Sequence, residues 1–138
     1  MIKHHLGYNE QDLATSPYAK YFNPQIAPMQ QQVIEAIACG GQTQELFYPA
    51  KQAPSLLDDG YWPIETGYAQ SLGMGLNVFC LTKMPNVTPE MWDWWFGWHG
   101  DEANKYKLWH PHAHINAEWK DGQKGVQGYV GRTSHITE

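Results

Sequence analysis

The chain has 138 residues, 42% of them hydrophobic and 14% aromatic, which allows one modest domain with a hydrophobic core. Nine Lys and Arg against fourteen Asp and Glu give a formal net charge of −5, without the basic stripe that marks a nucleic-acid-binding surface. No apolar run approaches roughly 18 residues, and the N-terminal residues lack the apolar stretch of a secretory signal. We therefore expect no nucleic acid and no membrane among its partners, and a cytoplasmic location.

The N-terminal part, residues 1–66, is expected to be a small region of helix and loop. Residues 1–25 show no regular hydrophobic period. Apolar side chains then recur at helical spacing until a Gly-Gly pair ends the pattern, which predicts a helix at about 27–39. Three prolines in residues 42–66 indicate a long loop, with one short helical turn near residues 55–58.

The chain has two cysteines, Cys39 and Cys80, and no Cys-x-x-Cys spacing. Both lie among apolar residues. This usage is typical of two buried, reduced thiols in a cytosolic protein.

Residues 67–84 change from loop to an alternating pattern. Their apolar side chains fall mostly on even-numbered positions, which predicts a strand. Gly73 and Gly75 permit a bulge or a tight bend within it.

A tryptophan-rich helix is predicted at about 89–99. Thr88 is suited to cap its first turn, and Pro89 is suited to the first helical position. Because the helix is apolar on nearly every side, we expect it to be buried on more than one side. Its tryptophans are expected in the core, with Trp95 as a wall of an aromatic pocket. His99 is expected to interact with the helix's C-terminal carbonyls.

A second short helix follows at about 101–108, and the chain becomes extended from Ile115. Asp121 and Gly122 form a hairpin-turn signal, after which a strand is predicted from about Val126 to Glu138. Because the chain ends inside this strand, we expect it to be a fragment.

Three closely spaced histidines, His110, His112 and His114, form the densest group of candidate metal ligands. Imidazole binds zinc readily, and an extended strand would place all three on one face. Pro111 argues against a regular strand there. The alternative is a polar turn whose histidines meet water or a helix end.

Two other groups could take part in chemistry. His135 and Glu138 should face opposite sides of a strand, so they are not expected to bind one ion together. The phenol of Tyr106 can bind a ligand hydroxyl or assist proton transfer, unless it is a core tyrosine with a satisfied hydroxyl. For Glu138, the alternative is an exposed charge at a strand end.

The segments MWDWWFGWHGDEANKYKLWHPHAH and GYVGRTSHITE resemble the diacetylphloroglucinol hydrolase family, which includes phloretin hydrolase. The resemblance runs from about Gly67 to Glu138 and includes the eight-residue spacing from Tyr106 to His114. It implies an α+β fold with two parts. Residues 1–66 would be a small N-terminal helical region, and residues 67–138 the first half of a START-like helix-grip catalytic domain with a curved antiparallel sheet, apparently truncated.

The resemblance also implies a zinc site of two histidines and two glutamates. His114 and Glu138 would be the first pair of ligands, and a later His-x-x-x-Glu motif, which the chain does not reach, would supply the second. Tyr106 and Glu138 would be catalytic. Tyr106, Asn116 and Trp95 would bind substrate, although Asn116 is shifted by one residue from the family's asparagine. The fragment alone is expected to be inactive.

The implied activity is zinc-dependent hydrolysis of the carbon–carbon bond between an acyl group and a polyhydroxylated aromatic ring, so the partner would be a small aromatic ketone. A non-catalytic START-like module that binds flat hydrophobic ligands is the first alternative. A cupin-like metal enzyme built on the histidine cluster is the second. A homodimer is the assembly that we consider.

Overall fold

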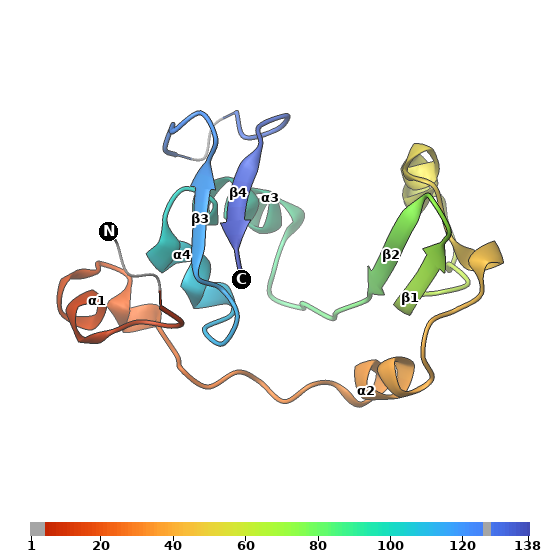
Figure 1. Cartoon of the computed structure of the whole chain (residues 1–138), viewed down its shortest axis with the longest axis horizontal. Coiled ribbons are helices and arrows are strands. Elements are labelled where there is room, and N and C mark those ends of the chain that lie inside the picture. Colours follow the sequence, from red (N-terminus) through yellow and green to blue (C-terminus); the bar gives the residue numbers. More distant parts are fainter. Residues whose placement is uncertain (1–4, 126–127) are drawn as a thin grey trace. The chain divides into compact units, whose positions relative to one another are not determined.

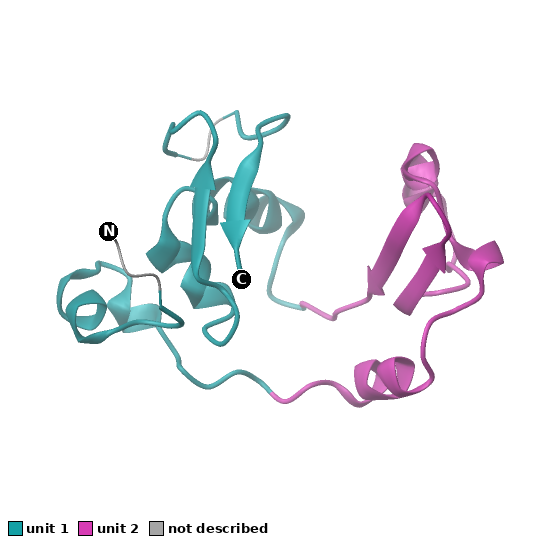
Figure 2. Cartoon of the chain, viewed as in Figure 1, with its two compact units in different colours: residues 1–27, 85–138 teal, residues 28–84 magenta. Residues whose placement is uncertain are grey.

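The computed structural model describes residues 5–125 and 128–138, which belong to two compact units (Figure 2). One unit combines Met1–Ala27 with Pro85–Glu138, and the other is Pro28–Met84. Figure 1 labels their helices and strands, which have the following bounds: α1 Glu10–Thr15, α2 Gln31–Ala38, β1 Thr66–Ser71, β2 Gly75–Cys80, α3 Pro89–His99, α4 Ala103–Trp109, β3 Asn116–Trp119 and β4 Ser134–Thr137. In the described ranges no helix has the length and apolar character needed to span a membrane.

The unit of residues 28–84 is built on a β-hairpin rather than on the single strand predicted over residues 67–84. Strands β1 and β2 pair antiparallel, from Thr66 opposite Cys80 to Ser71 opposite Gly75. Gly73 and Gly75 have φ angles of 83° and 113°, which glycine adopts at no steric cost. The two glycines therefore reverse the chain instead of bending one strand.

The rest of this unit agrees in part with the elements predicted from the sequence. Helix α2 confirms the predicted helix but begins at Gln31, later than expected. The predicted loop contains two 3₁₀ segments, Gln44–Leu46 and Ala50–Leu57, where one short turn was expected. Cys39 and Cys80 are both exposed, so the expectation of buried thiols is wrong.

In the other unit, the N-terminal segment has more order than its composition predicted. Helix α1 begins with a capping box, in which Asn9 and Asp12 exchange side-chain and backbone hydrogen bonds. The Tyr8 hydroxyl donates to the carbonyl of Asn104, 2.5 Å away in α4, and the Tyr8 ring stacks on Phe22. These contacts join the segment to the helix that carries Tyr106.

The tryptophan-rich helix α3 has the predicted bounds. The Thr88 hydroxyl accepts a hydrogen bond from the Met91 backbone, as an N-cap should. Burial on more than one side is wrong for the first turns, since Trp92 and Trp94 are 43% and 47% exposed in this chain. Only Gly97 and His99 of the helix are buried.

A buried ion pair holds the junction between α3 and α4. Lys105 Nζ lies 2.6 Å from Asp101 Oδ1, and the side chains are only 9% and 3% exposed. The other carboxylate oxygen accepts from the Gly125 backbone at 2.9 Å, and the ammonium lies over the Trp98 ring. Asp101 thereby connects the helices to the loop that follows β3.

Strands β3 and β4 form the second antiparallel pair, with Asn116 opposite Thr137 and Trp119 opposite Ser134. The predicted strand over residues 126–138 is too long, because only its last residues are extended. Residues 128–133 form turns and irregular backbone, and residues 126–127 lie outside the described residues.

Mixed helices and small antiparallel sheets confirm the α+β class. The described strands make two two-stranded sheets, and the helix-grip architecture stays a prediction. The compact units also divide the chain at other points than the expected boundary between residues 66 and 67, so that domain division stays a prediction too.

Candidate active site

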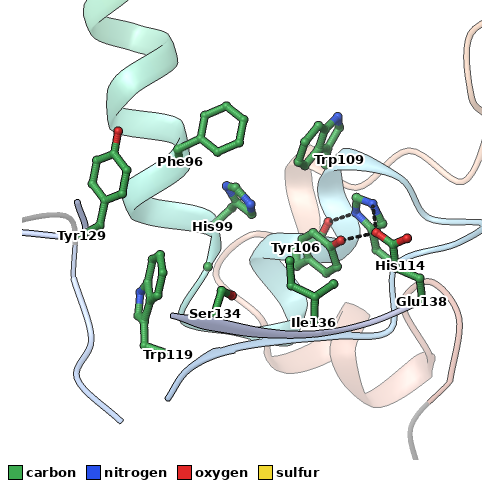
Figure 3. A pocket seen from close by; sticks show the side chains of 11 residues that line it. Phe96, His99, Tyr106, Trp109, His114, Trp119, Tyr129, Ser134, Ile136 and Glu138 are labelled. Carbon is green, nitrogen blue, oxygen red and sulfur yellow. Dashed lines mark hydrogen bonds and ion pairs between the residues drawn. The ribbon is translucent and has the colours of Figure 1, made fainter. Parts of the chain in front are cut away.

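The unit that contains α3, α4, β3 and β4 has a cavity of about 330 Å³, within the usual size range of small-molecule sites (Figure 3). Its walls are mostly aromatic. The lining residues are Phe96, His99, Gly100, Tyr106, Trp109, His114, Trp119, Tyr129, Ser134, Ile136 and Glu138.

The secondary structure explains which side chains reach the cavity. On β4, alternation places Ser134 and Ile136 on the inner face, and Glu138 continues the series just beyond the strand. His135 lies between them on the outer face, with Nδ1 4.0 Å from Glu118. The expected separation of His135 and Glu138 to opposite sides is confirmed.

His114 is held by Tyr106 in two ways. Its Nδ1 lies 3.0 Å from the Tyr106 backbone carbonyl, and the two rings stack with centroids 3.7 Å apart and planes inclined by 1°. Because a carbonyl oxygen only accepts, Nδ1 carries the proton in this hydrogen bond and Nε2 keeps a lone pair. The eight-residue spacing thus places the imidazole directly against the phenol.

Glu138 meets both of these side chains with one oxygen. The Tyr106 hydroxyl donates to Glu138 Oε1 at 2.5 Å, and His114 Nε2 lies 3.4 Å from the same atom (Figure 3). The carboxylate is 57% exposed, whereas the imidazole is only 9% exposed. The phenol from α4, the imidazole that follows the next turn and the carboxylate at the end of β4 therefore converge at one edge of the cavity.

Burial shifts the pKa values of the ring groups in this site. It lowers the pKa of His114, and the neutral imidazole is favoured. It raises the pKa of Tyr106 well above its ordinary value, an effect reinforced by the hydrogen bond to Glu138 and by that carboxylate's charge. At neutral pH the phenol therefore keeps its proton while His114 Nε2 remains an electron-pair donor.

His110, His112 and His114 are not arranged as an extended strand would place them. Residues 111–113 form a turn, as Pro111 indicated, and the histidines do not share the face of a strand. His112 Nε2 bonds the Pro24 carbonyl at 2.7 Å, away from the cavity. Within residues 5–125 and 128–138, no group of three or more His, Cys, Asp or Glu side chains is placed to hold a metal ion.

Two residues expected to bind substrate do not line the cavity. Asn116 alternates along β3 with buried Ala117 and with Trp119, which does line it, so its side chain lies on the other face of the strand. The Trp95 ring stacks on the His99 ring, with centroids 5.3 Å apart, and Trp95 is not among the residues that line the cavity. Their roles in binding stay predictions.

The cavity also contains residues that the sequence did not single out as functional. His99 does interact with a carbonyl at the helix end, as expected, but it also lines the cavity. Trp119 and Ser134 contribute polar side-chain atoms. The alternation of side chains along β4 could have indicated that Ser134 lies on the same face as Ile136. No such local pattern places His99 of α3 or Trp119 of β3, because their positions depend on tertiary packing.

A family model described as the DAPG hydrolase PhiG domain matches residues 47–138, two thirds of the chain. The chain belongs to this family. The matched region includes the whole cavity, with Tyr106, His114 and Glu138.

Curated relatives of the family agree. The chain is 32% identical over 111 residues to a 2,4-diacetylphloroglucinol hydrolase of Pseudomonas protegens, which covers 78% of this chain and 36% of that protein. It is 34% identical over 117 residues to the phloretin hydrolase of Eubacterium ramulus, and this match covers 81% of this chain and 41% of that protein. The chain therefore spans about two fifths of the length of the curated relatives that it matches.

Proposed function

We propose that the protein hydrolyses the carbon–carbon bond between an acyl group and a polyhydroxylated aromatic ring, as the names of its relatives suggest. The observation that carries the proposal is the meeting of Tyr106, His114 and Glu138 at the edge of an aromatic cavity. A flat ring suits aromatic walls, and the polar edge supplies a proton donor beside two electron-pair donors. The site is part of the START-like helix-grip domain that the resemblance implies.

Two of the atoms at this edge also suit one half of a zinc site. His114 Nε2 and Glu138 Oε1 are both acceptors and lie 3.4 Å apart without a proton of their own between them. These two residues would hold the ion, since an imidazole nitrogen and a carboxylate oxygen are groups that zinc accepts. The Tyr106 carbonyl, which fixes the imidazole, is the kind of outer partner that metal-bound histidines commonly have. Two further ligands would have to come from beyond the residues that the structure describes.

Hydrolysis requires a proton for the ring carbon, stabilisation of the charge on the acyl oxygen, and a hydroxyl group from water for the acyl carbon. A bound zinc ion would supply Lewis-acid stabilisation and activation of water. Tyr106 holds its proton on Oη and is positioned to hydrogen-bond a phenolic oxygen of the ring. Glu138 Oε1 accepts from that hydroxyl and can take up or return a proton there. The products are the ring with a hydrogen at the former acyl position and a carboxylic acid.

The test uses the complete gene product. Wild type is expected to bind zinc and to release a carboxylic acid from 2,4-diacetylphloroglucinol or phloretin. His114→Ala should lose bound zinc by elemental analysis and lose product release by chromatography. His112→Ala is the matched control, because its imidazole bonds the Pro24 carbonyl outside the cavity. Unchanged zinc in His114→Ala would remove this residue from the metal site.

The same experiment separates the enzyme from a START-like binding module. A module of that kind would bind the aromatic ketone in the cavity without releasing acid. Binding of phloretin by wild type without any product in the presence of zinc would therefore favour the module and refute the hydrolase.

A further inference from the structure

We propose that His99 contacts the substrate in the same cavity, with Nε2 accepting a hydrogen bond from a phenolic hydroxyl of the ring. This inference rests on the proposed function and extends it, since it assigns a second imidazole to recognition of the polyhydroxylated ring rather than to the metal.

The hydrogen bonding of His99 leaves one nitrogen available. Nδ1 lies 2.7 Å from the backbone carbonyl of Trp95, one turn earlier in α3. Because that carbonyl only accepts, the proton is on Nδ1 and the Nε2 lone pair is free to accept. Within the described part of the chain, the His99 side chain makes its hydrogen bond through Nδ1, and Nε2 has none.

Aromatic neighbours fix the direction of the ring. His99 lies nearly parallel to Tyr106, with centroids 5.6 Å apart and planes at 17°, and meets Phe96 and Trp109 edge to face. All four side chains line the cavity, and the His99 side chain projects from α3 toward the open space between them (Figure 3). A held ring loses little conformational entropy when a ligand binds.

The environment of His99 favours a ligand group over water. The residue is only 5% exposed, and this burial lowers its pKa and keeps it neutral, so it is an acceptor at neutral pH. A neutral imidazole nitrogen that faces the cavity with no partner in the described residues is available to a ligand hydroxyl.

Two residues of the cavity wall each have a buried polar atom without a partner within the described residues. These atoms are Trp119 Nε1, which can only donate, and Ser134 Oγ, which can do both. An aromatic-walled cavity that holds the His99 acceptor together with the Tyr106 hydroxyl and the Glu138 carboxylate suits a flat ring with several hydroxyl and carbonyl oxygens. This is the chemistry of an acylated polyphenol rather than of a plain aromatic hydrocarbon.

The experiment compares the complete gene product with two variants, His99→Phe and His135→Gln. Phe keeps the stacking against Tyr106 but removes the acceptor, and His135 is an exposed histidine outside the cavity. Binding of phloretin and of its ring O-methylated derivatives is measured by calorimetry, and kcat and KM with phloretin by product release. We expect His99→Phe to weaken phloretin binding and raise KM about tenfold, the effect of one lost hydrogen bond. We also expect it to reduce the preference for phloretin over the O-methylated ligands, while His135→Gln behaves as wild type.

A second measurement keeps the inference testable if His99→Phe fails to fold. In ¹⁵N spectra of the wild type, the His99 Nε2 resonance should show an unprotonated nitrogen and should shift toward a hydrogen-bonded acceptor when phloretin is added. An unchanged resonance, or unchanged binding and selectivity in a folded His99→Phe variant that still cleaves phloretin, would overturn the role of His99 and leave the proposed function standing. If wild type neither binds nor cleaves phloretin, the proposed function fails and this inference fails with it.

Discussion

Replacing Asp101 by Asn tests how the loop after β3 is held against the helices. In the wild type, its carboxylate lies 2.6 Å from Lys105 Nζ, and both side chains are almost completely buried. Removing one partner of a buried ion pair leaves the other charge uncompensated, at a cost of about 3–5 kcal/mol. The Asn amide oxygen can still accept from the Gly125 backbone, and the ammonium keeps its contact with the Trp98 ring. We therefore expect a loss at the lower end, about 3 kcal/mol.

The assay is urea unfolding of the complete gene product, followed by circular dichroism, for Asp101→Asn, Lys105→Met and the double variant. The double variant should recover part of the loss, because an apolar side chain replaces the uncompensated charge. A loss below about 1 kcal/mol, or equal losses from Asp101→Asn with and without Lys105→Met, would refute the ion pair as the cause.

The pH dependence of this difference has a definite sign. Burial alone would raise the pKa of Asp101, but the hydrogen bonds from Lys105 and the Gly125 backbone, with the Lys105 charge, outweigh it and lower the pKa below its ordinary value of 3.8. A lowered pKa in the folded state stabilises the protein above the unfolded pKa, and this stabilisation is lost as the pH falls through the folded value. The advantage of wild type over Asp101→Asn should therefore be constant near neutral pH and shrink below about pH 4.

Gly100→Ala is expected to destabilise the protein by about 1–3 kcal/mol in thermal unfolding, because its Cβ would lie 2.8 Å from Cζ2 of Trp119; an unchanged melting temperature would show that this ring can move aside. Thr88→Ala should cost about 1 kcal/mol through loss of the N-cap bond to Met91, with Thr88→Ser as the control that keeps the hydroxyl and most of the stability. Removal of metal by a zinc chelator should abolish acid release from phloretin, and addition of zinc should restore it; activity that persists after chelation would contradict the proposed chemistry.

Local signals predicted the helices around the site. Thr88 and Pro89 fix the start of α3 because capping depends only on neighbouring residues. The same kind of signal at Asn9 and Asp12 was present in the sequence of α1, but the weak hydrophobic period around it concealed the helix. The strand over residues 67–84 was wrong for a local reason as well, since glycine permits both a bend and a reversal.

The candidate site could be predicted from the sequence only through the family resemblance. Residues 106 and 138 are 32 positions apart, and no hydrophobic period indicates that their side chains meet at 2.5 Å. The placement of Trp95 depends on how α3 rotates against α4, and that of Asn116 on which face of β3 turns inward. Both are properties of tertiary packing, and each moves the side chain away from the cavity wall.

The acceptor that orients His114 is a main-chain atom of residue 106, while the hydroxyl proton at the cavity edge belongs to that residue's side chain. Tyr106→Phe would therefore remove the hydroxyl and keep both the carbonyl and the stacked ring that orient the imidazole. Relatives with another aromatic ring at this position could thus differ in proton donation while the orientation of the imidazole proposed to bind zinc is kept.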